Sequence, residues 1–166
     1  MAVKIKKASD ADELRQIAVL AEKIWHECFK NIISDAQIDY MVGKFQSFEA
    51  MTDQTENHGY SYFQVYDSDD LCGYFAVKPE NDSRFFLSKL YLRKDKRGQG
   101  IARTMMNRVF EEAKIAGKKS VYLTVNKHNN HAADVYKKIG FRITGTPVTD
   151  IGGGFVMDDY VMEYLF

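Results

Sequence analysis

Three short apolar segments between residues 60 and 92 constrain the fold of this chain more than any other feature of its sequence. They read YSYFQVYD (60–67), LCGYFAVK (71–78) and RFFLSKLYL (84–92), and they are rich in the aromatic and β-branched residues that strands favour. The turns between them, SDD and PENDS, are too short to hold a crossover helix. The three segments are therefore predicted to be neighbouring antiparallel strands.

The C-terminal half follows a different pattern. After RKDKRGQG, apolar residues recur at helical spacing up to Gly117, the strand-like segment SVYLTVN (120–126) follows, and HAADVYKKI (131–139) is a short helix closed by a glycine. A strand-helix-strand unit predicts that strands 84–92 and 120–126 are parallel. FRITGTPV and FVMDDYVMEYLF, around three consecutive glycines, are predicted to form a final hairpin.

The N-terminal part is predicted to be mainly helical. VKIKKA (3–8) alternates like a short strand, and Ser9 and Asp10 then offer N-caps for a helix that runs to about Phe29. Ser34 caps a second helix, and SFEAMTDQTENHG (47–59) has room for a further short helical piece. The predicted order β-α-α-β-β-β-α-β-α-β-β describes one α/β domain over residues 1–166, with a mixed, largely antiparallel central sheet flanked by helices.

The composition and charge of the chain argue against several classes of function. Among the 166 residues, 23 are Lys or Arg and 23 are Asp or Glu, and a chain without a basic excess is not expected to bind nucleic acid. No apolar stretch reaches about 18 residues and the N-terminus does not resemble a signal peptide, so no membrane association is expected and the predicted location is cytoplasmic. Cys28 and Cys72 stand far apart without metal-ligand spacing, and no metal site is expected.

The segment RGQGIA (97–102) places glycines and an alanine between a basic cluster and the start of a helix. The first turn of a helix has unpaired N–H groups and a positive dipole end, and glycines let an anion approach the backbone closely. Lys94, Lys96, Arg97 and Arg103 add positive charge. Neither a P-loop nor a complete dinucleotide fingerprint is present, so the segment is predicted to bind a phosphate group of another kind.

Two motifs together resemble the GCN5-related N-acetyltransferase (GNAT) family. They are LYLRKDKRGQGIA and, after the strand that ends at Asn126, N-x-x-A-x-x-x-Y-x-x-x-GF from Asn129 to Phe141. The resemblance implies acetyl-CoA as cosubstrate, with its pyrophosphate on the backbone amides from Gly98 to Arg103 and its pantetheine between two splayed strands. The cofactor-binding residues it implies are Leu90, Leu92, Arg97, Gly98, Gln99, Gly100, Ile101, Ala102, Arg103, Asn126, Asn129 and Tyr136.

The family reaction, transfer of an acetyl group to an amine, implies roles for particular groups. The resemblance makes Tyr136 the acid that protonates the leaving sulfur and the backbone N–H of Leu90 the oxyanion donor. Many relatives carry a glutamate where this chain has Ser88, and serine cannot act as a simple base. A water chain, the neutral form of the substrate, or Glu27, His26 or His128 remain the alternatives for the general base.

The acceptor implied by the resemblance is a primary amine of a small molecule, polyamine-like molecules included, or of a peptide. Its specificity is expected to depend on the N-terminal helices and the last hairpin. The candidate residues there are the aromatic Trp25, Phe29, Tyr40 and Phe45 and the acidic Asp158, Asp159 and Glu163. A non-catalytic acetyl-CoA sensor is the alternative function, and assembly as a homodimer is left open.

Overall fold

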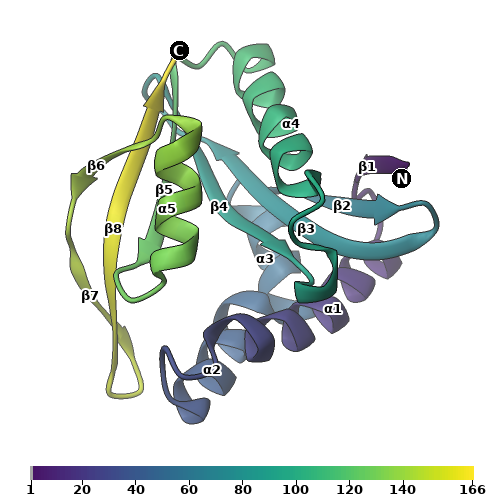
Figure 1. The fold of residues 1–166 in the computed structure, drawn as a ribbon. Coiled ribbons are helices and arrows are strands. Elements are labelled where there is room, and N and C mark those ends of the chain that lie inside the picture. Colours follow the sequence, from purple (N-terminus) through teal and green to yellow (C-terminus); the bar gives the residue numbers. More distant parts are fainter. Residues whose placement is uncertain (1) are drawn as a thin grey trace.

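The computed structural model describes residues 2–166 and contains an open, twisted sheet of eight strands, seven of them in the order β1-β2-β3-β4-β5-β8-β6 (Figure 1). All strand pairs are antiparallel except β4 and β5, which are parallel, and β7 pairs with the long strand β8. The strands are β1 (Val3–Lys7), β2 (Ser61–Asp67), β3 (Asp70–Pro79), β4 (Arg84–Leu92), β5 (Ser120–Asn126), β6 (Arg142–Gly145), β7 (Val148–Gly152) and β8 (Phe155–Leu165). The predicted fold class is confirmed.

Five α-helices and two shorter helical segments flank this sheet in residues 2–166. They are α1 (Ala11–Phe29), α2 (Asp35–Met41), the π-helical η1 (Val42–Gln46), α3 (Phe48–Asn57), the 3₁₀-helical η2 (Lys94–Lys96), α4 (Ile101–Ile115) and α5 (Asn130–Ile139). The predicted caps are present: the Asp10 carboxylate accepts from the Glu13 N–H, and the Ser34 hydroxyl from the Gln37 N–H. These side chains satisfy N–H groups that a helix start leaves unpaired.

The structure differs from the predicted element order at two places. The possible helical piece after residue 47 is a complete helix, α3, so three α-helices precede β2. The first arm of the predicted final hairpin is two strands, β6 and β7, which both pair with β8 and are separated at Thr146 and Pro147. Proline has no N–H to donate to a sheet, which explains the interruption.

Two helical layers cover opposite faces of the sheet (Figure 1). Helices α4 and α5 pack on one face over a core that includes Phe75, Leu87 and Val125. Helices α1 and α3 pack on the other face against Tyr62 and Tyr74. Across residues 2–166, no helix is both long enough and apolar enough to cross a membrane; the predicted cytoplasmic location stays a prediction.

Strands β4 and β5 separate after a short paired stretch. Their pairing extends only from Arg84 to Phe86 on β4 and from Ser120 to Tyr122 on β5, and beyond it the strands diverge (Figure 1). A bulge at Ser88 accompanies the divergence, because Leu87 and Lys89 pair with consecutive residues of β3. Bulges bend and twist a strand. The splay implied by the family resemblance is therefore present, and it leaves strand edges without a neighbour.

Candidate active site

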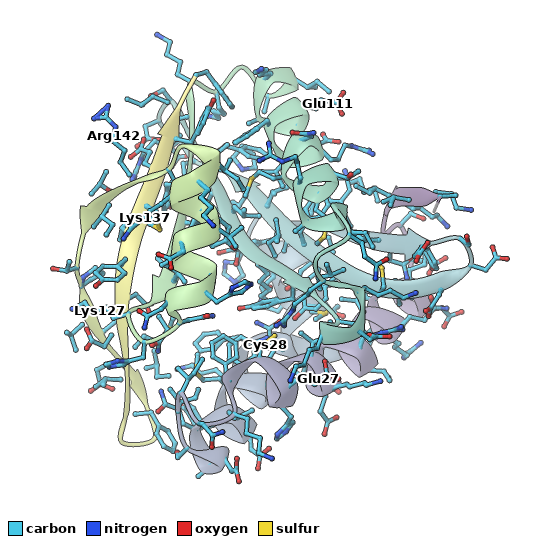
Figure 2. All side chains as sticks on the ribbon, in the orientation of Figure 1. Glu27, Cys28, Glu111, Lys127, Lys137 and Arg142 are labelled. Atoms are coloured by element: carbon cyan, nitrogen blue, oxygen red, sulfur yellow. The ribbon has the colours of Figure 1, made fainter. Side chains whose placement is uncertain are left out.

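A cavity of about 1010 Å³ passes through the region where β4 and β5 diverge. Its walls come from both strands, from the start of α4 and from α5 on one face of the sheet, and from α1, α2 and β8 on the other. Figure 2 shows the wall residue Cys28 between the ribbon of α1 and those of β4 and α5. The cavity thus connects the two faces of the sheet, so two molecules can meet within it from opposite sides.

The start of α4 forms one end of this cavity. Gly98 and Gly100 line it with φ angles of +76° and +85°, in the left-handed region that glycine adopts without steric cost. The first bond of the helix joins the Thr104 N–H to the Gly100 carbonyl, so the N–H groups before Thr104 have no partner inside the helix. A side chain at either glycine would enter open space. The helix start therefore offers N–H donors and room for an anion.

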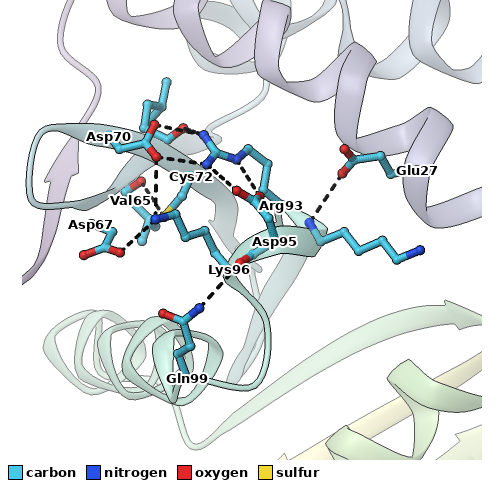
Figure 3. A network of polar contacts seen from close by, with 11 residues as sticks. Glu27, Val65, Asp67, Asp70, Cys72, Arg93, Asp95, Lys96 and Gln99 are labelled. Atoms are coloured by element: carbon cyan, nitrogen blue, oxygen red, sulfur yellow. Dashed lines mark hydrogen bonds and ion pairs between the residues drawn. The ribbon is translucent and has the colours of Figure 1, made fainter. Parts of the chain in front are cut away.

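Ion pairs anchor the loop that leads into α4 (Figure 3). Arg93 binds Asp70 and Asp95, each at 2.8–2.9 Å, and Lys96 binds Asp67 at 3.1 Å. The prediction that Lys96 adds positive charge around an anion was wrong, because its charge is matched by two carboxylates, those of Asp67 and Asp70. Its contacts instead join this loop to the β2–β3 turn, which holds the helix start in place.

The structure brings most of the predicted cofactor-binding residues to one cavity. The predicted residues among its walls are Leu90, Leu92, Arg97, Gly98, Gly100, Ala102, Asn126, Asn129 and Tyr136. Gln99, Ile101 and Arg103 are not among them. Ile101 is buried in the core, so its backbone amide is the part available for the predicted role, and Gln99 and Arg103 are exposed. The binding roles of all twelve residues stay predictions.

Tyr136 lies on α5, on the α4/α5 face of the sheet, and is half-buried. Burial of its phenol, followed by the neighbouring Cys28, raises the pKa of Tyr136 to about 12. The side chain is therefore protonated at neutral pH. Cys28 itself contacts the Arg97 guanidinium at 2.6 Å, and burial raises the pKa of its thiol.

The three side chains considered as general bases do not line the cavity. His26 pairs with Asp39 at 3.1 Å, Glu27 accepts from the Lys94 N–H at 3.4 Å, and His128 is exposed. Ser88 does line the cavity but has no basic group. The residue that sequence reasoning undervalued is Asp159, which lines the cavity and is buried, with 6% of its surface exposed.

The wall on the face opposite Tyr136 is mainly apolar. Trp25 and Phe29 stack with their ring centroids 4.3 Å apart, and Phe45 also contributes. Tyr40 is not part of the wall and instead donates a hydrogen bond to the Ile151 carbonyl. Lys89 is buried, and burial lowers the pKa of its amine to about 7. Its Nζ donates to the Phe45 carbonyl, the Gln54 side chain and the Tyr62 hydroxyl.

Comparisons with known proteins identify the family of this chain and agree with its fold. The sequence profile of the acetyltransferase (GNAT) family matches residues 21–141, which is most of the chain. The crystal structure of PaiA N-acetyltransferase from Thermoplasma acidophilum, in complex with coenzyme A, superposes with a TM-score of 0.82 and covers 100% of both chains. At 21% sequence identity this likeness shows a shared fold.

Two relatives are similar in sequence. An uncharacterized N-acetyltransferase of Mycobacterium tuberculosis is 37% identical over 55% of this chain, and the match spans 58% of that relative's length. The Spermine/spermidine N(1)-acetyltransferase of Bacillus subtilis is 26% identical, with 75% of this chain and 84% of that protein covered.

Proposed function

This chain belongs to the GNAT family of acetyltransferases, and from that premise we propose that it transfers the acetyl group of acetyl-CoA to a primary amine. The observation that carries the proposal is the single cavity that joins the start of α4 to the opposite face of the sheet between β4 and β5. A cofactor held from one face and an amine held from the other can react inside it.

The residues present fit acetyl-CoA. The pyrophosphate would lie at the start of α4, where Gly98 and Gly100 leave space and the first-turn N–H groups lack helical partners. The pantetheine has two amides, which match the strand edge of β4 beyond Phe86 that β5 leaves unpaired. In this arrangement Leu90, Leu92 and Asn126, which line the cavity, would hold the pantetheine.

When bound, acetyl-CoA supplies an activated acetyl thioester. Tyr136 is placed to donate its phenolic proton to the sulfur as negative charge develops there, and its pKa of about 12 keeps that proton in place until then. The N–H of Leu90 is the proposed donor to the carbonyl oxygen.

The test is release of free CoA from acetyl-CoA by the purified protein with a panel of amines. The panel holds aromatic and alkyl monoamines, amino acids, a peptide and, because the Bacillus relative is named for them, spermine and spermidine. We expect release above the no-amine rate with at least one class, and acetylated amine by mass spectrometry. Tight acetyl-CoA binding without turnover of any amine would instead favour the sensor function.

A further inference from the structure

Asp159 occupies an unusual position for a carboxylate. It lies on β8 opposite Asn126 of β5, and cross-strand partners share a face of the sheet. The residues next to this pair, Val125 and Tyr160, pack into the core on the α4/α5 face. Because successive side chains alternate between faces, Asp159 projects toward the α1/α2 face, opposite Tyr136. Within residues 2–166 no hydrogen bond to its side chain is present, so the carboxylate is available to a ligand.

The charges of the cavity wall are unevenly distributed. Within residues 2–166, Asp159 is the only carboxylate that lines the cavity. The remaining charged wall residues are bases, among them Lys89 and Lys78, whose Nζ lies 5.4 Å above the Tyr60 ring. On the α1/α2 face the apolar wall residues are Trp25, Phe29, Ile32, Ile33, Met41, Phe45, Phe86 and Met157.

We propose that the acceptor is a monoamine with an apolar body, and that Asp159 receives its ammonium group and takes up the proton that must leave before the nitrogen can attack. The proposal rests on the acetyl transfer proposed above. In this proposal the base, Asp159, and the acid, Tyr136, lie on opposite sides of the divergence between β4 and β5. Neither proton transfer therefore obstructs the other.

The proton balance of this step is complete. One N–H bond of the ammonium breaks and its proton goes to the Asp159 carboxylate, which leaves a neutral amine. The nitrogen lone pair then forms the C–N bond as the C–S bond breaks. The sulfur takes the Tyr136 proton, and the phenolate takes a second proton from the nitrogen. The products are the acetamide, free CoA, protonated Asp159, which returns its proton to solvent, and Tyr136 in its starting state.

The surroundings suit Asp159 to this role. Burial and then the neighbouring Asp158 raise the pKa of Asp159 to about 6, while Lys127 opposes the rise. Tyr91 of β4 lies close enough to interact with Asp159 electrostatically, and it also interacts with Tyr136 and Cys28. An apolar cavity also disfavours the charged form of an amine, which favours loss of the ammonium proton inside it. The carboxylate form predominates above pH 6.

The same charge pattern disfavours polyamines. Spermidine carries three amines, and one of them can pair with Asp159. Within residues 2–166 the wall offers no second carboxylate, so the other ammonium groups would approach apolar side chains, neutral amides such as that of Gln37, or the basic Lys78, and a buried charge without an opposite charge is unfavourable. A monoamine with an aryl or alkyl body leaves no charge unpaired and places its apolar part against Trp25 and Phe29.

The first experiment compares Asp159→Asn with the control Asp12→Asn, whose carboxylate pairs with Arg15 at 3.2 Å and is not part of the cavity wall. With 2-phenylethylamine at pH 7, we expect kcat/KM to fall about 100-fold or more in Asp159→Asn and to stay within a few-fold in the control. Above pH 10, where the amine is neutral by itself, the loss should shrink. An unchanged kcat/KM in Asp159→Asn would overturn the role of Asp159.

Two further readouts do not depend on that variant. In the wild type, log kcat/KM should rise with pH through about 6, because the protonated carboxyl cannot accept a proton. An NMR titration of the Asp159 carboxyl carbon in the free protein should give the same midpoint of about pH 6. A midpoint near the ordinary value of about 3.9 would contradict the assignment of Asp159 as the base.

The second experiment measures kcat/KM of the wild type for 2-phenylethylamine, hexylamine and spermidine. We expect at least a tenfold preference for a monoamine over spermidine. A preference for spermidine would overturn the acceptor assignment and leave the acetyltransferase function intact. Absence of turnover with every amine in the panel would instead contradict the function itself, so the two failures are distinguishable.

Discussion

Tyr136 illustrates how one residue acquires its chemistry from its surroundings. Its place in α5 follows from the local sequence, but its raised pKa comes from burial and from Cys28, which belongs to α1. We predict that Tyr136→Phe lowers kcat and kcat/KM together by about 100-fold, because phenylalanine keeps the ring but cannot donate a proton. Steady-state assays with the best amine of the panel measure both constants.

The matched control is Tyr164→Phe. Tyr164 packs against Phe110 and Phe141 and is not part of the cavity wall. This control should keep wild-type kinetics. Both Tyr164→Phe and Tyr136→Phe should bind acetyl-CoA with the affinity of the wild type. If Tyr136→Phe turned over as fast as Tyr164→Phe at every pH, the phenol would have no part in the reaction.

At the scale of an element, α4 owes its binding potential to the two glycines before its first turn. We predict that Gly100→Val weakens acetyl-CoA binding at least tenfold, because valine puts a branched side chain in the space the pyrophosphate needs. The left-handed φ of +85° adds a folding cost of roughly 1–2 kcal/mol for a residue with a Cβ. Calorimetric titration with acetyl-CoA measures the affinity.

Gly117 provides the control for backbone strain. It follows the C-terminal end of α4 with a φ of +74°, a side chain there also meets open space, and it is not part of the cavity wall. Gly117→Val should therefore lose a similar amount of stability and keep its affinity. Equal affinity losses in the two variants would show that strain in α4, and not contact with the ligand, explains the effect.

At the scale of the whole molecule, the cavity joins elements from both halves of the chain, so a ligand that fills it should stabilise the fold as a unit. We predict that acetyl-CoA at about 100 times its Kd adds about 2.7 kcal/mol to the free energy of unfolding. For a chain of this size the melting temperature should rise by roughly 5–10 °C. Differential scanning fluorimetry with CoA, acetyl-CoA and ADP provides the measurement, and no shift with any of the three would contradict the proposed cofactor site.

Much of the architecture could be predicted from the sequence, because local rules govern it. The short turns SDD and PENDS impose antiparallel pairing on β2, β3 and β4, and the Asp10 and Ser34 caps mark where α1 and α2 begin. The glycine motif and the motif from Asn129 to Phe141 indicated the family, which the profile match confirms. Each of these signals lies within a stretch of a few to about two dozen residues.

Only the tertiary structure decided which side chains meet in the cavity. Asp159 looked like one of several hairpin carboxylates until the β5–β8 pairing placed it opposite Asn126, whereas Glu27, His26 and His128 proved to lie outside the cavity wall. Lys96 similarly proved to pair with Asp67. Burial, charge pairing and the set of side chains that line one cavity depend on contacts between residues far apart in the chain. Local periodicity of the sequence carries no information about such contacts.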